Sequence, residues 1–166
     1  MRYADGPGVS VEVEIDAPPA RVWEFVSDID LSARFSEEFQ GAEWLDGATG
    51  PAPGATFRGT KRHPAVGEWQ TTSVLVACEP EVAFAWAVGD ADNPAASWRF
   101  ELARADGGAT RVRYSCVLGP APSGLSAAIE RMPDKEERII ERRLDEHRAN
   151  MQRVLDGIKQ LAEAES

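Results

Sequence analysis

The sequence has no hydrophobic run that could cross a membrane, because a spanning helix needs roughly 18 or more consecutive apolar residues and no such run occurs. The first residues, MRYADGPGVS, also lack the basic and then apolar layout of a secretion signal. We therefore expect a cytoplasmic protein without membrane insertion.

Cysteine and histidine are scarce, with two of each in 166 residues. Cys78 and Cys116 lie in strand-like apolar runs, which predicts small buried core residues in a reducing compartment rather than a disulfide. No spacing in the sequence is typical of a metal site, a phosphate-binding glycine loop or a dinucleotide fingerprint. Ser123, Ser126 and Asp134 also have no hydrolase-like relation to either histidine. We expect no metal and no cofactor.

Basic residues are outnumbered, with 18 Lys and Arg against 28 Asp and Glu, which gives a formal net charge of -10. Such a charge repels phosphate backbones and anionic membrane surfaces, so nucleic-acid binding is disfavoured. The length and the 43% hydrophobic content fit one compact domain over residues 1–166, with an ordered core at about 8–164. It is expected to be a monomer or a homodimer.

What the chain does contain is a series of strand patterns and a few helical ones. Residues 8–16 alternate strictly between apolar and acidic or hydroxyl residues, which predicts a half-buried strand. Pro18 and Pro19 then suit the start of a short helix. A second short helical piece is expected at 31–39, where Phe35 and Phe39 lie one turn apart. Six further strands follow between residues 40 and 119, and their short connections predict antiparallel hairpins.

One face of these strands is rich in large apolar side chains. Alternation places Val82, Phe84, Trp86 and Val88 on one face, with Ala83, Ala85 and Ala87 opposite. The matching residues of the next two strands are Trp98, Phe100, Leu102, Val112, Tyr114, Cys116 and Leu118. Such a surface must be covered by another element or must receive an apolar ligand. Thr71, Thr72 and Ser73 lie in a strand without clean alternation, so which hydroxyl points inward stays open.

The covering element is a long helix, predicted from the residue after Pro133 to about Ala164. At about 100° per residue, its apolar residues fall within about 60° of Ile140. That stripe comprises Ile140, Leu144, His147, Met151, Val154, Leu155, Ile158 and Ala162. Only His147 interrupts its apolar character. Arg143 flanks the stripe and either meets a carboxylate at a cavity mouth or extends into solvent, whereas His63 is expected to be exposed and without a role.

The order of these elements, together with four stretches of sequence, resembles the START-like (SRPBCC) superfamily. The stretches are IDAPPARVWEFVSDID, GAEWLDG, GATFRG and TTSVLVACEPEVAFAW. Within that superfamily, the chain is similar to the polyketide cyclase/dehydrase and lipid transport group. The resemblance implies an α+β helix-grip fold, in which a curved seven-stranded antiparallel sheet wraps around a long C-terminal helix, with two short helices after the first strand. Where relatives carry Pro-Glu-Trp or a similar aromatic step, this chain has ARFSEEF, and Phe35 is expected to take that packing role.

The resemblance also implies a function, namely binding of a hydrophobic or aromatic small molecule in the space between sheet and helix. The apolar candidates for ligand contact are Phe57, Phe84, Trp86, Trp98, Phe100, Leu144 and Met151. The alternative for these side chains is that they simply fill the core.

A second hypothesis is a polyketide aromatase/cyclase or dehydratase that needs no cofactor. A buried His147 has a lowered pKa and is a candidate general base, while the Tyr114 hydroxyl could stabilise an enolate oxygen. The alternative is that both are hydrogen-bonded core residues. A third hypothesis is a protein-interaction module like the chaperone cofactors that share this fold.

Overall fold

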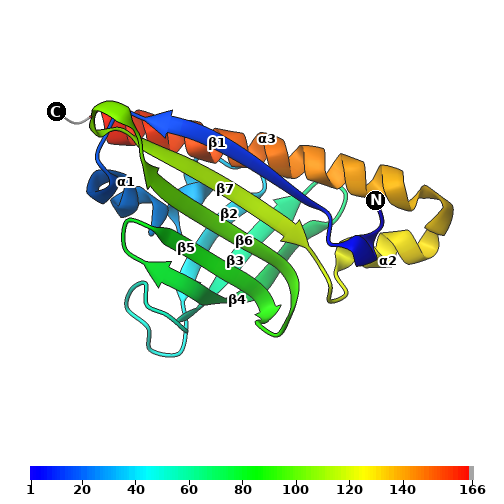
Figure 1. The fold of residues 1–166 in the computed structure, drawn as a ribbon. Coiled ribbons are helices and arrows are strands. Elements are labelled where there is room, and N and C mark those ends of the chain that lie inside the picture. Colours follow the sequence, from blue (N-terminus) through cyan, green and yellow to red (C-terminus); the bar gives the residue numbers. More distant parts are fainter. Residues whose placement is uncertain (165–166) are drawn as a thin grey trace.

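A curved antiparallel sheet of seven strands wraps around one long helix in this computed structural model, which confirms the predicted helix-grip fold (Figure 1). The structure describes residues 1–164; residues 165 and 166, which the predicted single domain includes, lie outside the described residues. The strands are β1 (Gly8–Ile15), β2 (Phe39–Trp44), β3 (Thr56–His63), β4 (Gly67–Glu79), β5 (Ala83–Asp90), β6 (Asn93–Arg104) and β7 (Thr110–Leu118). The helices are α1 (Pro19–Val26), α2 (Gly124–Arg131) and α3 (Glu136–Glu163), with short 3-10 helices at Tyr3–Asp5 (η1), Leu31–Arg34 (η2), Asp106–Gly108 (η3) and Pro133–Lys135 (η4).

Consecutive strands from β2 to β7 pair as antiparallel neighbours, as their short connections predict. The sheet order is β1-β7-β6-β5-β4-β3-β2, so β1 and β2 lie at opposite edges although they are neighbours in sequence. The chain from β1 to β2 must therefore cross from one edge to the other, and α1 and η2 lie on this crossing. Figure 1 shows α1 beside the C-terminal part of α3, and α2 beside its start.

The second short helix of the crossing differs from the prediction. Its regular part, η2, ends at Arg34, and Phe39 already belongs to β2, so Phe35 and Phe39 do not share a helix face. The reason is local, because the Ser36 hydroxyl accepts the backbone N–H groups of Glu38 and Phe39 at 3.1 and 3.0 Å. A serine that bonds to its own neighbouring backbone stabilises a turn at the expense of a helix.

A bulge explains why β4 lacks clean alternation. The pairing of β4 with β5 shifts between Leu75 and Ala77, which leaves Val76 as an extra residue that is 54% exposed. Before the bulge, Ser73 and Leu75 are buried, whereas Thr72 is exposed. Thr71 and Ser73 therefore supply the inward hydroxyls.

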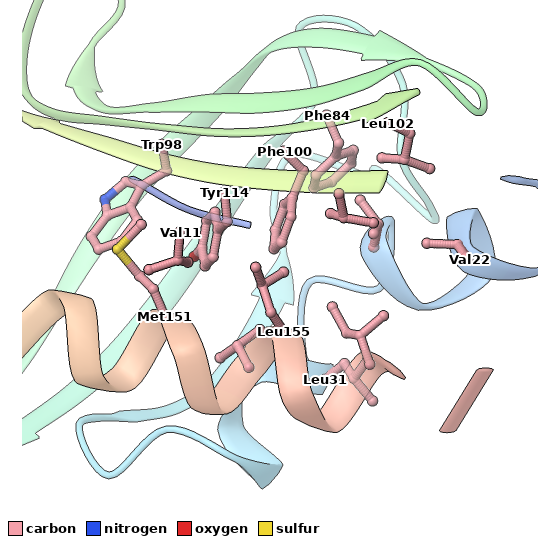
Figure 2. Packing of buried hydrophobic residues seen from close by; sticks show 14 of the residues in the cluster. Val11, Val22, Leu31, Phe84, Trp98, Phe100, Leu102, Tyr114, Met151 and Leu155 are labelled. Carbon is pink, nitrogen blue, oxygen red and sulfur yellow. The ribbon is translucent and has the colours of Figure 1, made fainter. Parts of the chain in front are cut away.

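The predicted apolar face forms the core together with the stripe of α3. Figure 2 shows Trp98, Phe100, Tyr114 and Phe84 extending from the sheet toward Met151 and Leu155 of α3. Val82 was assigned wrongly to this face, because it precedes β5 in a turn and is 46% exposed.

The two cysteines are both free, but only one is fully buried. Cys116 lies in the core, whereas Cys78 is half-buried at the end of β4. No helix among residues 1–164 has the length and apolar character needed to cross a membrane.

The chain before β1 packs on the end of the sheet that lies near α2. The Tyr3 hydroxyl donates to the carbonyl of Ala121 at 2.7 Å, and the Tyr3 backbone N–H donates to Glu136 at 2.8 Å. Regular structure thus begins before residue 8, the expected start of the ordered core.

Candidate functional site: a cavity between the sheet and the long helix

A cavity of about 80 Å³ lies between the inner face of the sheet and α3. Its sheet wall is mostly aromatic, its helix wall is one side of α3, and a third wall is the segment between α1 and β2. Six of the seven predicted apolar contact residues line it, and these are Phe57, Phe84, Trp86, Trp98, Phe100 and Met151. The seventh, Leu144, is half-buried and does not line the cavity, because it lies closer to the start of α3.

The aromatic wall is held by contacts between its own rings. Phe100 and Tyr114, which pair across β6 and β7, stack with centroids 3.9 Å apart and planes 10° apart. Trp86 and Trp98, which pair across β5 and β6, stack at 6.3 Å. Cross-strand aromatic pairs of this kind stabilise a sheet and fix the orientation of each ring. The wall is therefore ordered without a ligand.

His147 points at the sheet, as its helical phase predicts. Its residue surface is 6% exposed, and its ring meets the ring of Trp98 edge to face with centroids 5.0 Å apart. Burial lowers the pKa of His147 well below its ordinary value of 6.5, and the nearby charges of Arg143 and Lys61 lower it further. The imidazole is therefore neutral near pH 7 and able to accept a proton.

Tyr114 lines the same cavity, and its ring packs near that of Trp98, with centroids 5.8 Å apart. Only 5% of the residue is exposed, and burial raises the pKa of its hydroxyl far above the ordinary value of 10.0. The hydroxyl is therefore protonated at any physiological pH and is a potential hydrogen-bond donor.

Four charged or titratable residues form a network beside the cavity, which Glu38 lines, and we call them the ion cluster: Glu38, His63, Arg143 and Glu146. Arg143 donates to both carboxylate oxygens of Glu38, at 2.6 and 2.7 Å, and to Glu146 at 3.0 Å. Glu146 also accepts a hydrogen bond from Nε2 of His63 at 3.1 Å. The cluster connects the start of β2, the tip of the β3–β4 hairpin and α3, which lie far apart in sequence.

The ion cluster decides two open points of the sequence interpretation. Arg143 meets a carboxylate, that of Glu38, at the cavity mouth and does not simply extend into solvent. The expectation for His63 was wrong, because the ring is half-buried and contacts Glu146 through its Nε2, while its Nδ1 accepts the backbone N–H of Ala65 at 3.0 Å. Burial alone would raise the pKa of Glu146, but the hydrogen bonds from His63 and Arg143 lower it on balance.

A second, outer hollow of about 400 Å³ lies on the solvent side of the ion cluster, between the β3–β4 hairpin and α3. Glu38 and Asn150 line both this hollow and the inner cavity. These two residues are therefore part of the partition between the two spaces.

Sequence reasoning missed several polar residues of the cavity, of which Lys61 is the basic one. In β3, the alternate residues Phe57, Gly59 and Lys61 all line the cavity. Two-residue alternation from Phe57 was the signal that could have identified it, but no face was assigned to the residues of this strand. The Lys61 amine lies 5.2 Å from the ring centroid of Trp98. No group of three or more His, Cys, Asp or Glu residues in the described part of the chain is placed to hold a metal ion.

Comparisons with known proteins agree with this architecture. Residues 7–163 match the family described as polyketide cyclase / dehydrase and lipid transport. A polyketide cyclase-like protein from Corynebacterium glutamicum is 26% identical, with a TM-score of 0.65 over 94% of this chain and 91% of its own. A search of the curated proteins found no match.

Two further solved structures resemble this chain in fold. A di-domain ARO/CYC protein from the BE-7585A biosynthetic pathway is 22% identical, with a TM-score of 0.69 over 96% of this chain and 51% of its own, so this chain spans about half its length. A protein from Mycobacterium smegmatis is 17% identical, with a TM-score of 0.61 over 99% of this chain and 96% of its own. At these identities the likeness concerns the fold alone.

Proposed function

This chain belongs to the polyketide cyclase / dehydrase and lipid transport family, and from that premise we propose that it binds a hydrophobic or aromatic small molecule between the sheet and α3. The observation that carries the proposal is the aromatic wall. Rings stacked at Phe100–Tyr114 and Trp86–Trp98 present ordered apolar surface to a cavity. Mostly apolar pockets with a few polar groups are the usual sites for such ligands.

The volume of the cavity limits how a ligand enters. The cavity of about 80 Å³ is smaller than the roughly 150 Å³ that an engineered protein cavity needed to bind benzene. Binding therefore requires side chains to move. We expect the side chains of the partition, Glu38 and Asn150, to be the ones that move, because the hollow of about 400 Å³ lies directly beyond them.

Thr71 and Thr72 provide a matched test of the site. Thr71 lines the cavity and pairs with Gly59, which also lines it, whereas Thr72 is exposed on the opposite face. Thr71→Phe is expected to fill the cavity and weaken ligand binding by about tenfold or more, since it takes space that the ligand needs. Thr72→Phe is expected to leave binding unchanged.

Binding can be followed by the fluorescence of Trp86 and Trp98, which line the cavity. The probe is 2-acetylnaphthalene, an apolar aromatic ketone. Quenching that saturates in the wild type and in Thr72→Phe, but not in Thr71→Phe, supports the cavity as the binding site. Equal binding by both variants places the ligand elsewhere and contradicts the proposal.

A second candidate function is an aromatase/cyclase or dehydratase. The observation that favours it is a neutral, buried His147 in the same cavity as the protonated hydroxyl of Tyr114. His147 would remove a proton alpha to a substrate carbonyl, and Tyr114 would donate to the oxygen on which negative charge develops. With a linear poly-β-keto thioester as substrate, His147→Gln is expected to abolish turnover and retain binding, whereas unchanged turnover rejects the base.

A further inference from the structure

Lys61 places a positive charge at the polar end of an otherwise aromatic cavity. It projects from β3 into the cavity, and its amine lies over the ring of Trp98, which in turn contacts His147. Burial lowers the pKa of Lys61, and attraction to Glu38 only partly offsets that effect. A desolvated ammonium group of this kind is costly unless an anion compensates it.

The carboxylates nearby are already engaged with other partners. Both oxygens of Glu38 accept from Arg143, at 2.6 and 2.7 Å. Glu146 accepts from Arg143 and His63, and it lines the outer hollow rather than the cavity. Within residues 1–164, Lys61 forms no hydrogen bond or ion pair that would satisfy its amine, and its aromatic contact with Trp98 is its principal interaction.

Two other polar residues that line the cavity, Asn150 and Ser36, have free hydrogen-bond donors, while their acceptor atoms already accept hydrogen bonds. The Oδ1 atom of Asn150 accepts from the backbone N–H of Glu37 at 3.1 Å and from Arg153 at 2.9 Å, which leaves its amide N–H groups as donors. The Ser36 hydroxyl accepts two backbone N–H groups, which leaves its own proton to donate. Both residues line the cavity.

We infer that the ligand is an aromatic acid, whose ionised carboxylate or acidic enol pairs with Lys61 while its ring system lies against Trp86 and Trp98. This inference rests on the proposed function and adds the chemical class of the ligand. Donors from Lys61, Asn150 and Ser36 match the acceptor oxygens of such a group. The aromatic wall supplies the apolar half of the site.

The test compares an acid with its neutral counterpart of nearly the same shape. The probes are 2-naphthoate and 2-acetylnaphthalene, titrated against the wild type, Lys61→Met and Arg58→Met by tryptophan fluorescence. Arg58 is the matched control, because it extends from the same strand, lines neither the cavity nor the outer hollow, and pairs with exposed Glu43. Lys61→Met is expected to remain folded, since it removes a desolvated charge from an apolar wall; thermal unfolding checks this.

The wild type and Arg58→Met are expected to bind 2-naphthoate more tightly than 2-acetylnaphthalene. Lys61→Met is expected to lose that preference, with 2-naphthoate weakened by about ten- to a hundredfold, as the loss of a charge-assisted hydrogen bond implies, and 2-acetylnaphthalene nearly unaffected. Lys61→Arg is expected to restore part of the preference.

The outcomes separate the two proposals. If the wild type binds 2-acetylnaphthalene but not 2-naphthoate, or if Lys61→Met keeps the preference for the acid, the aromatic-acid inference is overturned and the apolar binding function stands. If the wild type binds neither probe, the proposed function fails for aromatic ligands and the inference fails with it.

Discussion

Replacing Gly157 by alanine tests how closely the crossing segment packs on α3. Gly157 is a buried residue in the interior of α3, and a Cβ atom at that position would lie 2.5 Å from three ring carbons of Phe35. Glycine in a helix interior ordinarily costs about 1 kcal/mol relative to alanine. The structure supplies a reason for it here, because the Phe35 ring lies against the helix backbone.

The expected size of the effect follows from two opposing contributions. Carbon atoms in favourable contact are about 3.5–4.0 Å apart, so the ring would have to move by about 1 Å. Overpacking of this kind costs about 1–3 kcal/mol, and the gain in helix propensity is about 1 kcal/mol. Because three ring carbons are affected at once, we expect a net loss of about 1 to 2 kcal/mol in the free energy of unfolding.

Urea unfolding followed by far-ultraviolet circular dichroism measures this loss as a lower midpoint at an unchanged slope. Phe35→Ala provides the control background, because it removes the ring. There Gly157→Ala is expected to stabilise the protein by about 1 kcal/mol through helix propensity alone. Opposite signs in the two backgrounds are the signature of a direct contact. A gain in the wild-type background, or the same change in both, would refute the packing of Phe35 on Gly157.

Three further predictions concern the charged and titratable residues. Glu38→Gln is expected to lower the free energy of unfolding by about 2 to 3 kcal/mol in urea titrations, because it removes the buried charge that accepts two short hydrogen bonds from half-buried Arg143. A loss no larger than that of an exposed pair such as Glu43–Arg58 would contradict this. The unfolded state protonates His147 as the pH falls through 6.5, while the folded state resists protonation. The free energy of unfolding should therefore decline below that pH by up to about 1.4 kcal/mol per pH unit. His147→Leu should flatten this decline, and an equal dependence of stability on pH in both proteins would argue against a neutral buried ring. Lys61→Met is expected to raise the unfolding temperature at pH 7, since the folded state desolvates the ammonium group, and a lower unfolding temperature would show that the charge is already compensated.

The individual strands and the long helix could be predicted because their patterns are local. Residues 8–16 alternate without interruption. The stripe from Ile140 to Ala162 keeps the helical period of about 3.6 residues per turn over roughly six turns. The buried residues of β1, β6 and β7 follow the predicted faces. Hydrophobic alternation reports which face of an element is covered, and that information does not depend on the rest of the chain.

The errors occurred where a single residue changes the local geometry. The bulge at Val76 shifts the phase of β4, so no fixed alternation fits Thr71 through Cys78. The Ser36 hydroxyl bonds to the backbone N–H groups of Glu38 and Phe39, and the chain leaves the helical path that the spacing of Phe35 and Phe39 suggested. Both features depend on backbone hydrogen bonds that a hydrophobic pattern does not encode.

The site was only half predictable, and the division has a physical cause. The aromatic wall and His147 could be assigned, because each needs only the phase of its own element. The ion cluster could not, because Arg143 meets Glu38 across 105 positions and His63 meets Glu146 across 83. A glutamate before a strand and an arginine on a helix flank are solvated residues in most proteins, and only the tertiary arrangement brings Glu38 and Arg143 together beside the cavity.

Lys61 connects these two halves of the site. An ammonium group inside an aromatic cavity is expected to lower stability on balance, because burial penalises its charge. Nor does it close the cavity, because Arg143 already engages Glu38 and Glu146. A residue that lowers stability and is not needed to hold the fold is typical of a binding site, where stability is given up for an interaction with the ligand. The proposed pairing with an anionic ligand therefore accounts for the amine over Trp98 better than the packing of the sheet does.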